Sequence, residues 1–259
     1  APMNVPLRPH EIMRATVMAI YRRRVILGPL AAEGAVINEL NTALAKRPAP
    51  PGHWSQAWID VAQGAVAWSQ GRADQAAAAI EKGVALGGRL DHPLTAWGLL
   101  VAGRIAMEKG DAIAAAKLFE EATFAAADFA DGRALEEGFR LAVAAHQVAG
   151  TPGVPATVRG GSAWAKRSLP VLRASLLASE AEILASAGNA KAAAARLAEI
   201  DARFLQGDAG RGRVGAAVAH ASALAAYALG DTASGDAAMQ RALQVARGRS
   251  PRLFQASRL

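Results

Sequence analysis

Apolar side chains recur every three or four residues along most of the chain, which is the spacing of an amphipathic α-helix. A glycine ends each helical stretch, in the series Gly28, Gly71, Gly110, Gly150, Gly188 and Gly230. Successive glycines are 38 to 43 residues apart. Glycine most readily adopts the left-handed backbone needed where a chain leaves one helix and turns back. The pattern therefore predicts a series of antiparallel helix pairs joined by short turns.

Two neighbouring stretches share the same internal spacing of small and large apolar residues. The first carries Gly64, Ala67, Gly71, Ala76, Ile80 and Gly83. The second carries Gly103, Ala106, Gly110, Ala115, Phe119 and Ala122. Small residues where two helices cross, beside one larger apolar residue, allow close ridge-into-groove packing. We therefore expect these positions to form the contacts within each helix pair.

The second stretch resembles the tetratricopeptide (TPR) motif at Gly103, the Gly110-Asp111 turn, Ala115, Phe119 and Ala122. This resemblance implies an all-α, right-handed α-solenoid of about six antiparallel helix pairs. The period of roughly 40 residues is longer than the usual 34 of the motif, and Ala67 and Ala106 stand in place of its tyrosine. HEAT-like helix pairs, whose period is nearer to 40, are the alternative fold.

The repeats predict one helical-repeat domain over residues 1–259, because each pair can stack on the next without a separate core. The approximate repeat boundaries are 8–47, 53–88, 92–128, 132–168, 169–206 and 211–248, and a C-terminal tail covers 249–259. Residues 48–52 predict a turn between the first two repeats.

A second interruption falls in the fourth repeat. Two prolines and three glycines within residues 151–161 predict a surface loop, because both residue types disfavour a regular helix. One long helix, from about residue 162 to residue 187, is expected after the loop. Inside that helix, Pro170 marks either a kink or the true first turn.

The composition supports helices and narrows the chemistry. Hydrophobic residues make up 52% of the chain and aromatic residues only 5%, so the apolar positions are mostly alanine, the strongest helix former. No uncharged apolar run reaches the roughly 20 residues that a membrane-spanning helix needs, so we expect a soluble chain, cytoplasmic or periplasmic. The absence of cysteine excludes disulfides and cysteine metal sites.

The chain carries a net charge of +7, which can attract anionic partners at long range. Its clearest basic run is Arg22, Arg23 and Arg24. Three successive helical residues fan out over most of the helix circumference, so we expect one of them to point inward and the others into water. No recognisable nucleic-acid module or set of stacking aromatics accompanies the charge, and we expect no nucleic-acid partner.

The usual signatures of catalysis are weak in this sequence. The five histidines lie in different repeats and form no i, i+4 pair of the kind that binds metal on a helix. Gly210, Gly212 and Gly215 match G-x-G-x-x-G, but the pattern before them is helical, whereas a dinucleotide site follows a strand. We therefore predict no catalytic residue, no metal and no cofactor.

The TPR resemblance also implies a groove, because the first helix of each pair lines the concave face in that family. The glycine register places on this face the candidate partner-binding residues Trp58, Trp97, Arg104, Arg140, His220 and Tyr227. It places Ala15, Met18, Arg22 and Val25 on the inward face of the first helix. Aromatic and arginine side chains dominate recognition surfaces. The alternative is that the tryptophans fill gaps in an alanine-rich core.

These features predict a non-catalytic scaffold that binds a protein or peptide in the groove. An anionic or C-terminal carboxylate group suits Arg104 and Arg140, because a guanidinium binds carboxylates through paired hydrogen bonds. The alternative function is an accessory or sensor domain of a larger protein. An enzyme on a helical scaffold is the third hypothesis, and it requires a deep pocket with convergent titratable groups.

Overall fold

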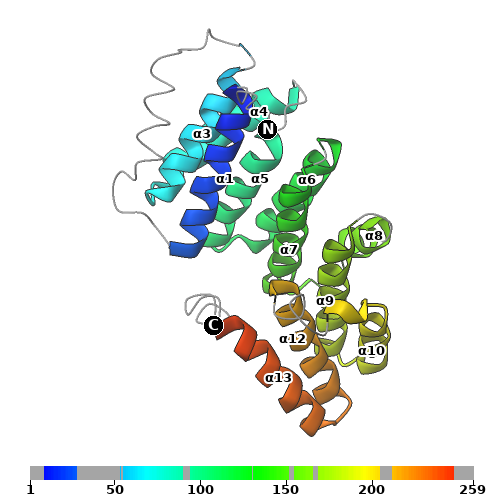
Figure 1. The fold of residues 1–259 in the computed structure, drawn as a ribbon. Coiled ribbons are helices and arrows are strands. Elements are labelled where there is room, and N and C mark those ends of the chain that lie inside the picture. The colour runs from blue at the N-terminus through cyan, green and yellow to red at the C-terminus, as the bar shows by residue number, and fades with distance from the viewer. Residues whose placement is uncertain are drawn as a thin grey trace, which may run out of the picture. The chain divides into compact units, whose positions relative to one another are not determined.

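A computed structural model of the chain describes residues 9–27, 53, 55–89, 94–129, 131–151, 155–165, 169–204 and 212–247. Within these ranges the chain forms eleven α-helices and one short 3-10 helix, and no strand (Figure 1). The predicted all-α class is therefore confirmed. No helix in this part of the chain is long and apolar enough to cross a membrane.

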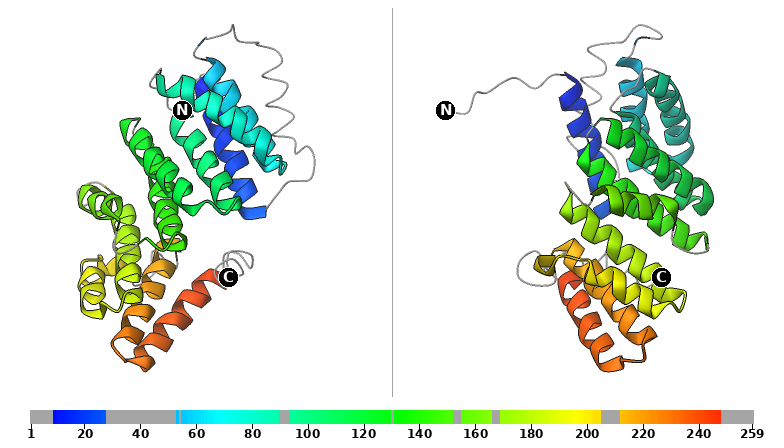
Figure 2. Two further views of the ribbon diagram at one scale, coloured as in Figure 1. Left: turned by 180° about the vertical axis from the view of Figure 1, so that it is seen from behind. Right: turned by 90° about the vertical axis from the view of Figure 1, so that its right-hand side faces the viewer.

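The chain divides into two compact units, residues 1–138 and 139–259. Unit 1 contains the helices α1 (Pro9–Leu27), α3 (Ser55–Ser69), α4 (Ala73–Arg89), α5 (Leu94–Glu108), α6 (Ala112–Asp128) and the start of α7 (Gly132–Val148). Unit 2 contains the rest of α7, α8 (Ala156–Ala165), α9 (Pro170–Ser186), α10 (Ala190–Ala198), η1 (Ala202–Phe204), α12 (Arg213–Ala228) and α13 (Thr232–Arg247). In both units, helices that follow one another pack together, as in α3 with α4, α5 with α6 and α12 with α13 (Figure 2).

The predicted left-handed glycines are confirmed at five turns, with φ between +66° and +82° at Gly71, Gly110, Gly150, Gly188 and Gly230. Gly28 lies outside the described residues. The turn at Gly110 shows how each one works. The Gly110 amide donates to Met107 O at 3.0 Å, and the Asp111 amide donates to Ala106 O at 2.9 Å. This Schellman pattern satisfies the last carbonyls of one helix just before the next begins.

The next helix is started by a polar side chain that follows the glycine. Asp111 Oδ1 accepts a hydrogen bond from the Ala114 amide at 2.9 Å, and Asp231 Oδ1 accepts one from the Ser234 amide at 3.0 Å. Asn189 has the same role at the start of α10. A glycine followed by Asp or Asn therefore ends one helix and caps the next, which is why the turns are so short.

The small residues of the repeat pattern lie where two helices of a pair approach closely. A Cβ at Gly103 on α5 would lie 2.4 Å from the Phe119 ring on α6, and one at Gly64 on α3 would lie 2.6 Å from Ile80 on α4. Phe119 is fully buried. The expected contact between the glycine of the first helix and the large residue of the second is thus confirmed in both pairs.

The loop predicted over residues 151–161 is wrong from residue 156 onward, because α8 begins at Ala156. Pro155 precedes the helix, and its carbonyl accepts hydrogen bonds from the Val158 and Arg159 amides. Its missing amide hydrogen costs little there, because backbone amides at the start of a helix have no acceptor within the helix. Gly161 allows the close approach of the Phe139 ring, 2.5 Å from where a Cβ would be.

The single helix predicted over residues 162–187 is also wrong, since α8 ends at Ala165 and α9 begins at Pro170. Pro170 is therefore the true first turn of α9, one of the two predicted alternatives. The predicted turn at residues 48–52 lies outside the described residues.

Candidate functional site

The candidate residues come from the first helices of the pairs, α3 and α5 in unit 1, α9 and α12 in unit 2, and α7, which begins in unit 1 and continues in unit 2. Within each unit, we call the side of these helices that carries the candidates the first-helix face of that unit. In unit 1, α3 and α5 contact each other and carry Trp58, Trp97 and Arg104. In unit 2, α9 and α12 contact each other, and α12 carries His220 and Tyr227. Arg140 lies half-buried on α7, also in unit 2.

The two candidate tryptophans of unit 1 are part of the core. Trp58 is 5% exposed and Trp97 is 2% exposed. The Trp97 indole donates to Asp131 Oδ2 at 2.9 Å, and the other Asp131 oxygen accepts the Ala134 amide at 3.1 Å at the start of α7. The packing alternative therefore describes where these tryptophans lie. No sequence pattern indicated Asp131 as the partner of the indole.

Arg104, Tyr21 from α1 and Glu137 from α7 form a triangle in which each side chain is hydrogen-bonded to the other two. Its Nε donates to Tyr21 Oη at 3.0 Å, its Nη2 donates to Glu137 Oε1 at 3.1 Å, and Tyr21 Oη donates to the same Glu137 oxygen at 3.0 Å. All three groups are largely withdrawn from solvent, where charge-assisted hydrogen bonds are stronger than in water. The guanidinium of Arg104 is thus already paired with a carboxylate of the same chain, that of Glu137.

A second polar group surrounds Glu108 at the end of α5. Its Oε1 accepts from Arg24 Nη2 at 2.9 Å and from the Trp68 indole at 3.1 Å. The Arg24 guanidinium also lies 5.1 Å from the centre of the Trp68 ring, a cation–π arrangement. Arg24 of α1 is therefore held by a carboxylate and an indole from two different first helices.

Tyr21 joins the two polar groups through its ring. The ring centre lies 5.5 Å from that of Trp68 and 5.6 Å from that of Trp97, the second in an edge-on arrangement. Such aromatic pairs add attraction beyond the area they bury. We call the residues Tyr21, Arg24, Trp68, Trp97, Arg104, Glu108 and Glu137 the Tyr21 cluster. It connects α1 with α3, α5 and α7.

The predicted inward face of α1 is corrected by this cluster. Ala15 and Arg22 are exposed, whereas the packed residues are Val17, Ile20, Tyr21 and Arg24. Alignment of the repeats by their turn glycines did not predict the buried face of α1, because α1 contacts several helices and not only the next one in the repeat order. The expectation that one arginine of the basic run points inward is confirmed, and it is Arg24. The signal that could have found this face is the run of apolar and aromatic residues at spacings of three and four.

In unit 2 the equivalent face is more open. His220 Nδ1 lies 3.6 Å from Glu182 Oε2 of α9, and their side chains are 42% and 31% exposed. The nearby Glu182 carboxylate, which favours the charged imidazolium, raises the pKa of His220 above its usual value. Tyr227 is 37% exposed, and its hydroxyl donates to Asp236 Oδ1 of α13 at 2.8 Å. That hydrogen bond raises the pKa of the phenol.

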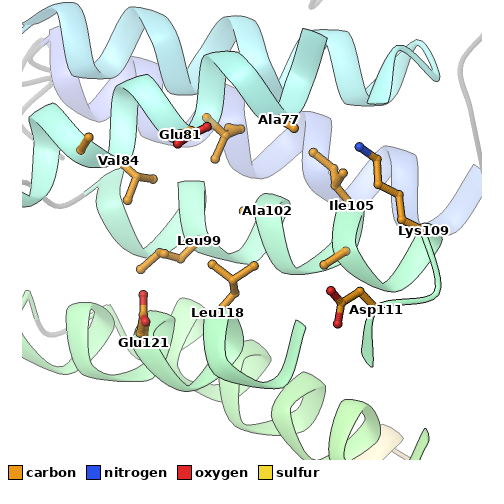
Figure 3. A pocket seen from close by; sticks show the side chains of 13 residues that line it. Ala77, Glu81, Val84, Leu99, Ala102, Ile105, Lys109, Asp111, Leu118 and Glu121 are labelled. Atoms are coloured by element: carbon orange, nitrogen blue, oxygen red, sulfur yellow. The ribbon is translucent and has the colours of Figure 1, made fainter. Parts of the chain in front are cut away.

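A cavity of about 500 Å³ lies between α4, α5 and α6 in unit 1 (Figure 3). Its apolar lining includes Val84, Leu99, Ile105 and Leu118. Glu81 and Glu121 lie toward the end with Val84, and Lys109 and Asp111 lie toward the end with Ile105. The Lys109 ammonium is paired with Asp74 at 2.7 Å. The sequence pattern did not indicate this cavity, because its lining comes from three different helices.

Metal ligation is not indicated in the described part of the chain, where no group of three or more His, Asp or Glu side chains could hold an ion. The first-helix side of unit 1 is covered by α1, and on α12 in unit 2 His220 and Tyr227 remain partly exposed.

Comparison with known proteins shows a likeness in structure alone. No family model matches the chain, and no curated protein matches its sequence. A crystal structure of nearly identical TPR-like repeats of kinesin light chain type from Podosopora anserina superposes with a TM-score of 0.53. It is 16% identical and covers 76% of this chain and 98% of its own.

A second crystal structure of those repeats, with one glutamine replaced by methionine, gives a TM-score of 0.55 at 16% identity, covering 74% of this chain and 95% of its own. The likeness agrees with the capped glycine turns and with the small residues at the helix crossings. It favours the TPR-like arrangement over the HEAT-like alternative. The chain therefore has the fold of TPR-like helical repeats.

Proposed function

We propose that the chain is a non-catalytic scaffold that binds a protein or peptide on the first-helix face of unit 2. The observation that carries this proposal is the stripe formed by His220, Leu224 and Tyr227. These residues follow helical spacing on one side of α12, beside Glu182 of α9. Each remains partly exposed, so the stripe offers apolar, aromatic and polar groups together, as recognition surfaces do.

The chemistry of the stripe favours a peptide with an apolar side chain next to a carboxylate. A protonated imidazole carries two donors. In His220 one of them faces Glu182, and the partly exposed ring can offer the other to a ligand carboxylate. Leu224 and the Tyr227 ring would pack against the apolar side chain. Arg140, half-buried on α7, is a further candidate for an anionic group of the same partner.

The remaining candidates, Trp58, Trp97 and Arg104, are not part of the proposed binding surface. Their side chains are engaged within unit 1 by Asp131, Tyr21 and Glu137 or by core packing. The scaffold assignment also draws on the TPR-like fold and on the character of the α4–α6 cavity. Its lining is apolar with charges at the ends, and a catalytic pocket instead gathers convergent polar groups. The proposal includes no nucleic acid, metal or cofactor.

A selected peptide tests this proposal. Peptides from a random library would be selected on the immobilised full chain, and the Kd of the best one measured by calorimetry. We expect His220→Ala and Tyr227→Ala each to weaken binding about ten-fold, or 1.4 kcal/mol. Lys191→Ala on α10, which removes an exposed side chain of the same unit, is the control and should bind like the wild type. Equal affinity for all four chains would contradict the proposed surface.

A further inference from the structure

The helix α1 touches the first helices of three successive pairs. Tyr21 and Arg24 contact Trp68 of α3, Tyr21 contacts Trp97 and Arg104 of α5, and Tyr21 donates to Glu137 of α7. Figures 1 and 2 show α1, in dark blue, alongside α3 and α5. In a simple repeat stack each pair contacts only its immediate neighbours. The helix α1 therefore lies on the face that α3, α5 and α7 share.

Among the side chains of α1 that the structure describes, those in contact with the other helices form one stripe with three polar anchors. Arg14 lies 3.9 Å from Asp131, Tyr21 binds Glu137, and Arg24 binds Glu108. Between the anchors, Val17 and Ile20 are buried. The spacings of three, four and seven residues keep all five side chains on one side of the helix.

The face opposite α1 is complementary in charge. It presents three carboxylates, those of Glu108, Asp131 and Glu137, around apolar walls made by Trp68 and Trp97. Arg104 orients Glu137 and the Tyr21 hydroxyl. A face of carboxylates and indoles is suited to a helix that carries basic and aromatic side chains.

The exposed half of α1, with Ala15, Ala19 and Arg22, takes no part in these contacts. The helix is thus bound as an amphipathic peptide is bound in a groove, by one apolar stripe with flanking charges. The middle of this stripe is buried, whereas the contact at Glu108 lies at its edge, where the Glu108 side chain is 40% exposed.

We propose that the face of α3, α5 and α7 is a helix-binding groove that α1 occupies within the chain. The external ligand is a basic amphipathic helix of a partner protein, with an aromatic hydroxyl side chain and an arginine one turn later. That helix takes the place of α1. This surface is separate from the His220 and Tyr227 stripe and goes beyond the function proposed for it.

A labelled peptide with the sequence of residues 9–27 is the probe, titrated into the full chain by fluorescence anisotropy. Arg24→Ala loosens α1 from Glu108 and Trp68 and leaves the groove intact. We expect this variant to bind the peptide about ten-fold more tightly than the wild type, because an internal occupant lowers apparent affinity by the fraction of open groove. Arg22→Ala makes the same chemical change on the exposed side of α1 and should bind like the wild type.

Two further variants locate the binding. Glu108→Gln and Glu137→Gln, each added to Arg24→Ala, should remove the gain, and so should a peptide with alanine in place of Tyr21 and Arg24. Equal peptide affinity for the wild type and Arg24→Ala would contradict the claim that α1 occupies the groove. Peptide affinity that is unchanged by both glutamate substitutions would contradict the location of the groove. Circular dichroism checks the fold of each variant. Tyr21→Phe, which removes only the hydroxyl that donates to Glu137, loosens α1 by a smaller change.

The occupant could instead be α1 of a second copy. Light scattering distinguishes this case, because exchange of α1 between chains gives a dimer whose fraction rises with concentration. A monomeric wild type supports the partner-helix assignment, and a dimer that dissociates on Arg24→Ala overturns it. His220→Ala should leave binding of the residue 9–27 peptide unchanged, so this experiment distinguishes the groove from the stripe on α12 in unit 2.

Discussion

Trp68 and Tyr227 occupy the same position in two different repeats but lie in different environments. Each is three residues before the glycine of its turn, and its carbonyl accepts the amide of that glycine at 3.0 Å. Trp68 in unit 1 is 1% exposed, whereas Tyr227 in unit 2 is 37% exposed. Trp68 is covered by Tyr21 and Arg24 of α1. Equivalent repeat positions are therefore core or surface according to what lies over the first-helix face.

The largest expected effect comes from truncating these two equivalent side chains. Trp68→Ala should lower the free energy of unfolding by about 3–5 kcal/mol, because it removes a buried aromatic side chain and leaves a cavity. Tyr227→Ala should lower the free energy of unfolding by much less than Trp68→Ala, since the Tyr227 ring is partly exposed. Urea unfolding followed by circular dichroism measures both. Similar losses in the two variants would break the comparison.

The second expected effect contrasts two arginines of α1 that are two residues apart. Arg24→Ala should destabilise the chain by about 1–3 kcal/mol, because it leaves Glu108 without its charge-assisted hydrogen bond. Arg22→Ala should change stability by less than about 0.5 kcal/mol, as exposed substitutions do. The same urea titration measures both variants. Equal values for the two would mean that α1 does not present its Arg24 side to the first-helix face.

The third expected effect concerns the pH dependence of the open face. The pKa of His220 is raised by Glu182, so the pair contributes stability below the unfolded-state value of about 6.5. This contribution is lost as the pH rises through the folded-state pKa of His220. Its size is small because both side chains are partly exposed.

Proton NMR of the His220 ring measures this pKa directly. Glu182→Gln should lower it, because the imidazolium loses its carboxylate partner. Lys191→Ala is the control and should leave the titration unchanged. A His220 pKa that does not respond to Glu182→Gln would show that the two side chains do not interact in solution.

The helix pairs were predictable from the sequence because their determinants are local. Gly110 followed by Asp111 marks a left-handed turn and a helix cap without reference to any other part of the chain. The Gly103 and Phe119 contact was also predictable, since it recurs at fixed spacing within each pair. The helix α8 was missed because Gly160 and Gly161 are poor helix formers, and only packing against Phe139 shows why Gly161 is needed.

The Tyr21 cluster was not predictable because its contacts join distant parts of the chain. Tyr21 and Glu137 are 116 residues apart, and Arg24 and Glu108 are 84 apart. The repeat register aligned residues within the pairs, but it carried no information on a helix that contacts three pairs at once. The position of Arg104 on α5, the first helix of its pair, follows from the sequence pattern. Its carboxylate and phenol partners required the structure.

The position of α1 on the first-helix face is tested most directly by a double-mutant cycle between Tyr21 and Glu137. Urea unfolding of the wild type, Tyr21→Phe, Glu137→Gln and the double variant gives their coupling energy. The hydroxyl of Tyr21 donates to the Glu137 carboxylate at 3.0 Å, so we expect a coupling of about 1–2 kcal/mol. Additive effects of the two substitutions, with coupling near zero, would contradict the placement of α1.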